Sequence, residues 1–186
     1  MSKPTRLLVL GLGNVLLGDD GVGAAAIVYL LDRYAVPRGV RVLDGGTLGL
    51  SLLPYLDEAD VVILVDAIRS DGPPGTLVRL DGDQVAPAVA TRLSPHQIGV
   101  SDLLDGARWL DRYPSRLVLL GLVPEDMALR VGLSSDVARS LPALVAQVVD
   151  EAASLGFCFP ADADARSDET TGALGAVDVA RLAGVR

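Results

Sequence analysis

Short apolar runs alternate with longer segments of helical periodicity along this chain, and this alternation limits the folds that it can adopt. Residues 7–10, 40–43, 61–65 and 117–120 have the length and composition of strands in a protein interior. Strands that are buried on both faces need helices above and below the sheet, as in parallel sheets. The pattern therefore predicts an α/β protein with a mostly parallel sheet between two layers of helices.

Four segments are predicted to form the helices: 22–34, 47–56, 98–110 and 136–155. Pro37 stops the first helix, Thr47 is the expected cap of the second, and Ser134-Ser135 and Gly156 mark the two ends of the fourth. Residues 76–80 alternate apolar and polar side chains, which favours a further strand nearer the edge of the sheet.

The length and the apolar content indicate a single domain. The chain has 186 residues and is 50% hydrophobic, which allows one substantial core but not two of ordinary size. From about Pro160 the composition shifts to Ala, Asp, Ser, Thr and Gly. We therefore expect one domain over residues 1–158 and a disordered tail over residues 159–186.

The charge and the N-terminal sequence restrict partners and location. The formal net charge is −8, and only −2 of it falls in residues 161–186, so the folded body is acidic and is expected to bind neither nucleic acid nor anionic membranes. Cys158 is the one cysteine and has no internal partner, which fits a reducing compartment. No signal-peptide core follows Met1, and no run reaches the roughly 18 apolar residues of a membrane span. A cytoplasmic monomer is expected.

In an open parallel sheet, ligands bind beyond the carboxyl ends of the strands, so the glycine-rich segment 11–23 is the first place to look for a site. It differs from a dinucleotide fingerprint because Leu16 stands where the third glycine should fall. It differs from a phosphate-binding P-loop because Asp19 stands in the lysine position. No nucleotide cofactor is therefore expected.

Three residues near this edge are candidates for chemistry, and each also has a structural interpretation. Asp20, or its neighbour Asp19, could cap the following helix. Asp66 ends a buried strand and could simply accept backbone N–H bonds, although a buried carboxylate needs some such partner. His96, the single histidine, could lie on the surface of a loop. Together, Asp20, Asp66 and His96 supply two oxygen ligands and one nitrogen ligand, a set that suits a borderline divalent metal with open coordination positions.

Several motifs in this order and spacing resemble those of the hydrogenase maturation proteases, and the similarity runs from about residue 7 to 155. They are Gly11-Leu12-Gly13-Asn14 with Asp19-Asp20-Gly21-Val22-Gly23, Asp44-Gly45-Gly46-Thr47-Leu48-Gly49, Asp66-Ala67, Ser94-Pro95-His96-Gln97, Gly121-Leu122-Val123-Pro124-Glu125 and Gly132-Leu133-Ser134.

The resemblance implies a twisted five-stranded sheet and an endopeptidase that trims the C-terminus of a nickel-iron hydrogenase large-subunit precursor. It also implies that Asp20, Asp66 and His96 are the catalytic and metal-binding residues, and that nickel arrives in the substrate. Some family members have glutamate where this chain has Asp20.

Two further expectations concern the substrate and the reaction. Residues Asp44, Gly45, Gly46 and Thr47 follow the second strand and either bind the substrate or form a capped glycine turn. A water activated by the metal or by a carboxylate would attack the scissile carbonyl. The alternative is a non-catalytic nickel-binding assembly chaperone that uses the same three ligands on the same precursor.

Overall fold

The computed structural model describes residues 6–90 and 95–161; for residues 90 and 95–98 it describes the backbone only. It contains one five-stranded sheet in the order β2-β1-β3-β5-β4. The strands are β1 (Leu7–Leu12), β2 (Val40–Gly46), β3 (Val61–Ala67), β4 (Leu77–Asp81) and β5 (Arg116–Leu122). All neighbouring strands are parallel except β4, which lies at the edge and runs antiparallel to β5.

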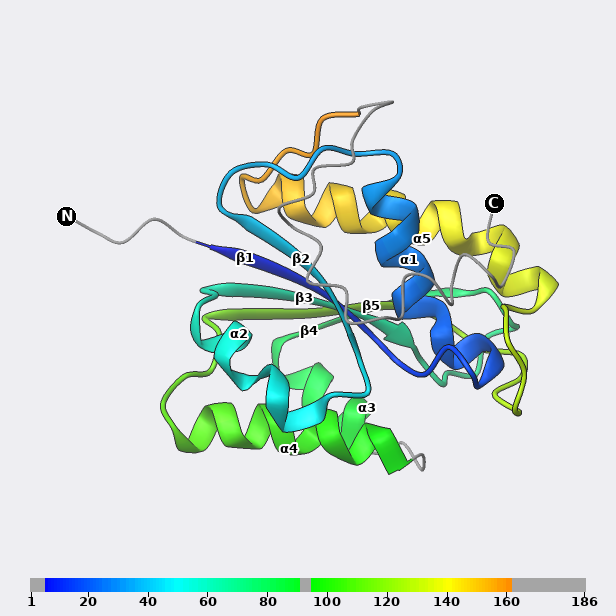
Figure 1. Cartoon of the computed structure of the whole chain (residues 1–186), viewed down its shortest axis with the longest axis horizontal. Helices are drawn as coiled ribbons and strands as arrows, with labels where there is room; N and C mark the ends of the chain where they lie inside the picture. Colours follow the sequence, from blue (N-terminus) through cyan, green and yellow to red (C-terminus); the bar gives the residue numbers. More distant parts are fainter. Residues whose placement is uncertain (1–5, 91–94, 162–186) are drawn as a thin grey trace.

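Helices cover both faces of this sheet, which confirms the predicted three-layer architecture (Figure 1). The helices α1 (Val22–Leu31) and α5 (Ser135–Ser154) lie on one face. The helices α2 (Leu53–Asp57), α3 (Val85–Ala90) and α4 (Pro95–Trp109) lie on the other. Short 3₁₀ segments, η1 (Gly18–Gly21), η2 (Gly49–Leu52) and η3 (Gly82–Gln84), precede α1, α2 and α3.

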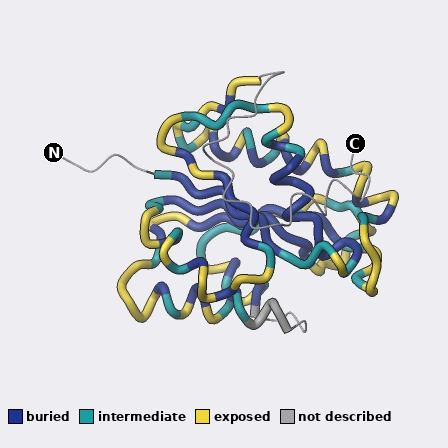
Figure 2. Tube along the Cα trace, in the orientation of Figure 1, coloured by how far each residue is buried: buried dark blue, intermediate teal, exposed yellow. Residues whose placement is uncertain are grey.

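Alternate residues of the central strands supply two separate cores, one for each helical layer. In β1, Leu7 and Val9 pack with α1 and α5, whereas Leu8, Leu10 and Leu12 pack with α2, α3 and α4. The strands are therefore buried on both sides (Figure 2), which explains why they read as apolar runs.

The order of the strands reverses at β1, and this reversal determines where the sheet has a crevice. The chain leaves β1 for β2 on one side and later returns to form β3 on the other side of β1. In such doubly wound sheets the crevice lies between the carboxyl ends of the two strands where the order reverses. Here those strands are β1 and β3.

Several predicted boundaries were wrong, and each has a local reason. The strands run two or three residues further into the polar motifs, because neighbouring strands continue the ladder through Gly11, Asp44 and Asp66. Helix α1 ends at Leu31 rather than residue 34, and the predicted helix over 47–56 is split into η2 and α2, with Thr47 outside both. The helices η3 and α3 were not predicted; Asp81 and Gln84 begin them with a reciprocal capping box.

The folded body also continues past the predicted boundary at residue 158. Phe159 is buried in the core beside α1 and α5, and the Pro160 carbonyl accepts a hydrogen bond from the Ala35 N–H at 3.0 Å. Residues 162–186, where the remainder of the predicted tail falls, lie outside the described residues. None of the helices in the described part of the chain has the length and apolar content needed to cross a membrane.

Candidate functional site

The loop that follows β1 folds back tightly on η1, and glycine makes this approach possible. Gly13 has φ +115°, and a Cβ atom there would lie 1.8 Å from the Asp20 carbonyl oxygen. No other residue type fits this position without moving the backbone. The Gly13 N–H also donates to the Gly46 carbonyl at 3.1 Å, which ties the loop to the end of β2. The sequence thus fixes η1 directly above the carboxyl end of β1.

Asp19 has a structural role that the sequence did not reveal. Its side chain is fully buried and accepts four hydrogen bonds: from the N–H groups of Glu125 (2.8 Å), Asp126 (3.1 Å) and Ser134 (2.6 Å), and from the Ser134 hydroxyl (2.8 Å). Ser134 precedes α5 as predicted, but its hydroxyl donates to Asp19 and does not cap the helix. The carboxylate therefore joins η1 to the segment between β5 and α5.

The same contacts weaken the nucleotide alternative. A P-loop directs successive backbone N–H groups at a phosphate. In this chain the N–H of Gly18 donates to the Arg130 carbonyl (2.7 Å) and that of Asp19 donates to the Asp126 carbonyl (2.9 Å). These two donors are already used within the protein.

Asp20 and Asp66 lie at the crevice between β1 and β3. Asp20 is buried in η1, and its Oδ2 accepts the Asn14 N–H at 2.8 Å. Neither Asp19 nor Asp20 caps α1, whose N-cap residue is Gly21. Asp66 is buried near the end of β3, opposite Gly121 of β5, and its Oδ1 accepts the Ala67 N–H at 2.7 Å. The structure therefore brings two buried carboxylates to the carboxyl ends of adjacent strands.

His96 lies in the first turn of α4, not in a loop as predicted, and its side chain lies outside the described part of the structure. The position of this turn follows from Gly49 and Gly99, whose backbones meet: a Cβ atom on Gly99 would lie 3.0 Å from the Gly49 Cα. Since Gly49 follows the carboxyl end of β2, α4 begins at the same edge of the sheet as Asp20 and Asp66. Among the described side chains, no three His, Cys, Asp or Glu residues are grouped to hold a metal, so the predicted trio stays a prediction.

Asp44 lies in a pocket of about 180 Å³ beside this crevice, lined by Gly13, Asn14, Val15, Asp44, Gly45, Gly46, Thr47 and Leu48. The Asp44 Oδ1 accepts the Gly46 N–H at 3.0 Å, while its Oδ2 is buried and has no hydrogen-bond partner among the described residues. Burial raises the pKa of Asp44 above its ordinary value, and the Gly46 hydrogen bond opposes this only in part. The predicted substrate residues thus line a real cavity.

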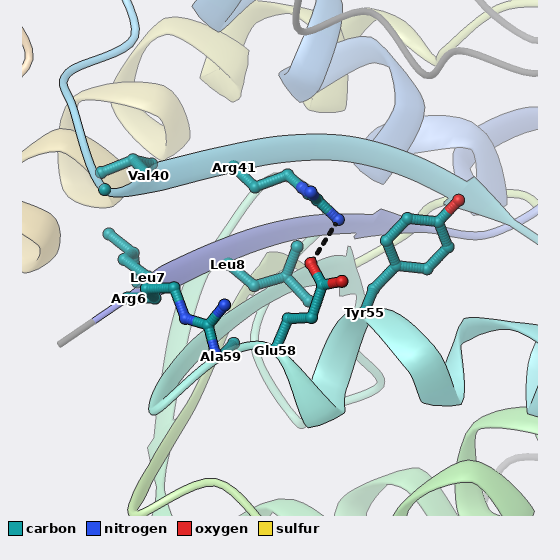
Figure 3. Close-up of a pocket in the computed structure, with 9 residues that line it drawn as sticks. Arg6, Leu7, Leu8, Val40, Arg41, Tyr55, Glu58 and Ala59 are labelled. Carbon is teal, nitrogen blue, oxygen red and sulfur yellow. Dashed lines mark ion pairs between the residues drawn. The ribbon is translucent and has the colours of Figure 1, made fainter. Parts of the chain in front are cut away.

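A second pocket lies at the opposite end of the strands (Figure 3). Arg41 of β2 forms an ion pair with Glu58 at 2.9 Å, and its guanidinium lies 5.5 Å from the centre of the Tyr55 ring. Both charged side chains are about half exposed, so the pair contributes little to stability. None of the predicted site residues lines this pocket, and the candidate site is the one at the carboxyl edge.

Comparison with solved structures shows which class of protein has this fold. The hydrogenase maturating endopeptidase HybD from Escherichia coli superposes with a TM-score of 0.82 and 34% sequence identity, covering 86% of this chain and 99% of that one. The [NiFe] hydrogenase maturation protease HybD from Thermococcus kodakarensis gives a TM-score of 0.67 at 28% identity, covering 80% and 99%. The architecture is thus that of hydrogenase-maturing endopeptidases.

The chain belongs to the hydrogenase maturation protease family, as the motifs predicted, since the model of that family matches residues 25–151. The Hydrogenase 2 maturation protease of Escherichia coli K12 is 37% identical over 145 residues, covering 77% of this chain and 88% of that protein. The hydrogenase expression/formation protein HupD of Rhodobacter capsulatus is 40% identical over 156 residues, covering 83% and 74%. The family match includes Asp66 and His96 but begins after Asp20.

Proposed function

We propose that this protein is an endopeptidase that removes a C-terminal peptide from the nickel-loaded large-subunit precursor of a nickel-iron hydrogenase. The proposal is supported by membership of the maturation protease family and by one structural observation in particular. Two buried carboxylates, Asp20 and Asp66, lie at the crevice where a doubly wound sheet binds ligands.

Burial of a carboxylate is unfavourable unless hydrogen-bond donors or a cation compensate for it, and two carboxylates that meet one ligand favour a cation. In the proposed reaction that cation is nickel, which belongs to the substrate and is held by the precursor's own ligands. Asp20, Asp66 and His96 complete its coordination, and binding of the metal places the adjoining peptide segment at the carboxyl edge.

The bond is cleaved by water in this proposal. The metal or one of the two carboxylates activates the water, which attacks the scissile carbonyl carbon. The C–N bond then breaks and the leaving amine takes up a proton. A cysteine nucleophile does not fit, because Cys158 follows α5 and is exposed outside the crevice.

The pocket around Asp44 is suited to hold the chain beside the cleavage point. Gly13, Gly45 and Gly46 have no side chains, so an extended peptide can approach their backbone closely. Asp44 is buried, which raises its pKa, and its Oδ2 has no hydrogen-bond partner among the described residues, so a polar group of the substrate can bind there. We assign Asp44, Gly45, Gly46 and Thr47 to substrate binding.

The test compares cleavage of the precursor with and without nickel, read by mass spectrometry of the products. We expect the wild type to release one defined C-terminal peptide from the loaded form only. His96→Ala and Asp66→Asn should lose cleavage, whereas Asp150→Asn, which changes an exposed carboxylate of α5, should not.

Three other outcomes would change the interpretation. If the precursor without nickel were cleaved as fast as the nickel-loaded form, the metal-gated mechanism would be refuted, but the protein would still be a peptidase. Binding of the loaded precursor without cleavage, by wild-type protein that is folded, would favour the chaperone alternative. If His96→Ala and Asp66→Asn both cleaved the precursor at the wild-type rate, neither Asp66 nor His96 would be needed for the reaction.

A further inference from the structure

Two neighbouring loops at the carboxyl edge expose large aliphatic side chains. Of the eight large hydrophobic residues that are exposed in the described part of the chain, three belong to these loops. Leu16 and Val131 are each 48% exposed and Leu129 is 83% exposed. We call Leu16, Leu129 and Val131 the apolar rim.

The rim is held in place by hydrogen bonds between its two loops. The Arg130 N–H donates to the Leu16 carbonyl at 2.9 Å, and the Gly18 N–H donates to the Arg130 carbonyl at 2.7 Å, which makes a short parallel β-bridge. The Asp19 carboxylate then fixes both ends of the second loop through Glu125, Asp126 and Ser134. The exposed side chains are therefore carried by backbone with a defined position.

The exposure of these three side chains does not stabilise the isolated chain. A leucine that remains 83% exposed contributes little hydrophobic free energy to folding. A preformed loop does lower the entropic cost of binding a partner, because its backbone need not be ordered at that step. Adjacent exposed apolar side chains of this kind mark protein-interaction sites.

The position of the rim favours one partner. Leu16 and the bridge between Leu17 and Arg130 directly precede η1, which carries Asp20, so a polypeptide bound at the crevice would lie next to the rim. A second copy of this chain fits less well. A two-fold interface would bring the exposed acidic residues Glu125 and Asp126 of one loop close to those of its partner.

We propose that the apolar rim is the docking surface for the precursor, and that it binds aliphatic side chains adjoining the segment to be cleaved. This inference rests on the proposed function, since it takes the precursor as the substrate. It assigns affinity to the rim and the chemical step to the crevice.

The test uses the double variant Leu129→Ser/Val131→Ser and a matched control, Trp109→Ser/Leu110→Ser. The control removes two exposed apolar side chains at the end of α4, and Trp109 is 92% exposed. We expect the rim variant to raise KM for the precursor at least tenfold with kcat changed less than twofold. The control should change neither, and both variants should keep the wild-type thermal midpoint.

A KM for the rim variant equal to that of the control would overturn the inference. So would sedimentation velocity showing a wild-type dimer that the rim variant dissociates, because the rim would then bind a second copy. Binding of immobilised precursor is measured in parallel. If the wild type binds it without cleavage, the proposed function fails, while selective loss of binding in the rim variant still supports the docking surface. If Leu129→Ser/Val131→Ser is unfolded, the single variant Leu129→Ser decides by the same criteria.

Discussion

Replacement of Asp19 tests whether its hydrogen bonds hold together the two loops beside the candidate site. Asp19→Ala leaves the N–H groups of Glu125, Asp126 and Ser134 without their acceptor. The first two are partly accessible to water, so each should cost about 1 kcal/mol, whereas the buried Ser134 N–H should cost about 2 kcal/mol. Removal of a desolvated charge returns part of this, which leaves a net loss of about 3 kcal/mol.

The variant Asp19→Asn keeps the shape of the side chain and changes only its hydrogen bonding and charge. An amide oxygen in the Oδ2 position can still accept from Glu125, Asp126 and the Ser134 hydroxyl. The amide nitrogen then faces the Ser134 N–H, where the carboxylate oxygen was 2.6 Å away, so a donor meets a donor. We expect a loss of about 2 kcal/mol, between the values of the alanine variant and the wild type.

Urea unfolding followed by circular dichroism gives both numbers, with Asp150→Ala as a control that removes an exposed carboxylate. A reduction of 3 kcal/mol is a large part of the roughly 5–15 kcal/mol that stabilises a domain of this size. If Asp19→Ala lowers the free energy of unfolding by less than about 1 kcal/mol, the four hydrogen bonds do not hold the loops together as described.

Two further predictions concern the same edge of the sheet. Gly13→Ala should lower the free energy of unfolding by about 3 kcal/mol or more, because its Cβ would overlap the Asp20 carbonyl oxygen and φ is +115°; a urea titration that matches the wild type would contradict this. Asp44→Asn should be more stable than the wild type at pH 7, because burial raises the pKa of Asp44 and the wild type loses stability as the pH rises from the ordinary value of 3.8 through the raised pKa of the folded state. The advantage should disappear below pH 3.8, where the carboxyl is protonated in both the folded and the unfolded state, and a less stable variant at pH 7 would refute this sign.

The sheet could be predicted because its strands are buried on both faces. A short apolar run such as residues 61–65 is typical of a strand that is buried on both faces. The polar residues that follow such a run lie at the carboxyl edge of the sheet, where a site can form. Asp66 and the pocket around Asp44 were therefore predictable from position alone.

The separate roles of Asp19 and Asp20 could not be predicted in this way. Both residues are acidic, adjacent and fully buried, and what distinguishes them is the contact of Asp19 with Ser134, 115 residues further along the chain. Local patterns contain no information about such a contact. The pair of adjacent acids and the Gly132-Leu133-Ser134 motif were the only signals, and neither identifies its partner.

Helix boundaries were missed for a similar reason. The segment over 47–56 has helical periodicity, but the close approach of Gly49 to Gly99 of α4 imposes a 3₁₀ turn before α2. Phe159 lies at the border of the predicted tail, and it packs into the core beside α1. In both cases tertiary contacts outweigh local preference.

The long sequence separation of the Asp19 contacts also has a consequence for biosynthesis. A growing chain exposes η1 early, but the groups that fix it, from Glu125 to Ser134, are synthesised more than a hundred residues later. On an incomplete polypeptide, η1 has only its local contacts, such as the hydrogen bond from the Asn14 N–H to Asp20, even after β1, β2 and β3 have paired. The loop that carries Asp20 therefore gains its full set of contacts only when nearly the whole domain has been translated and folded.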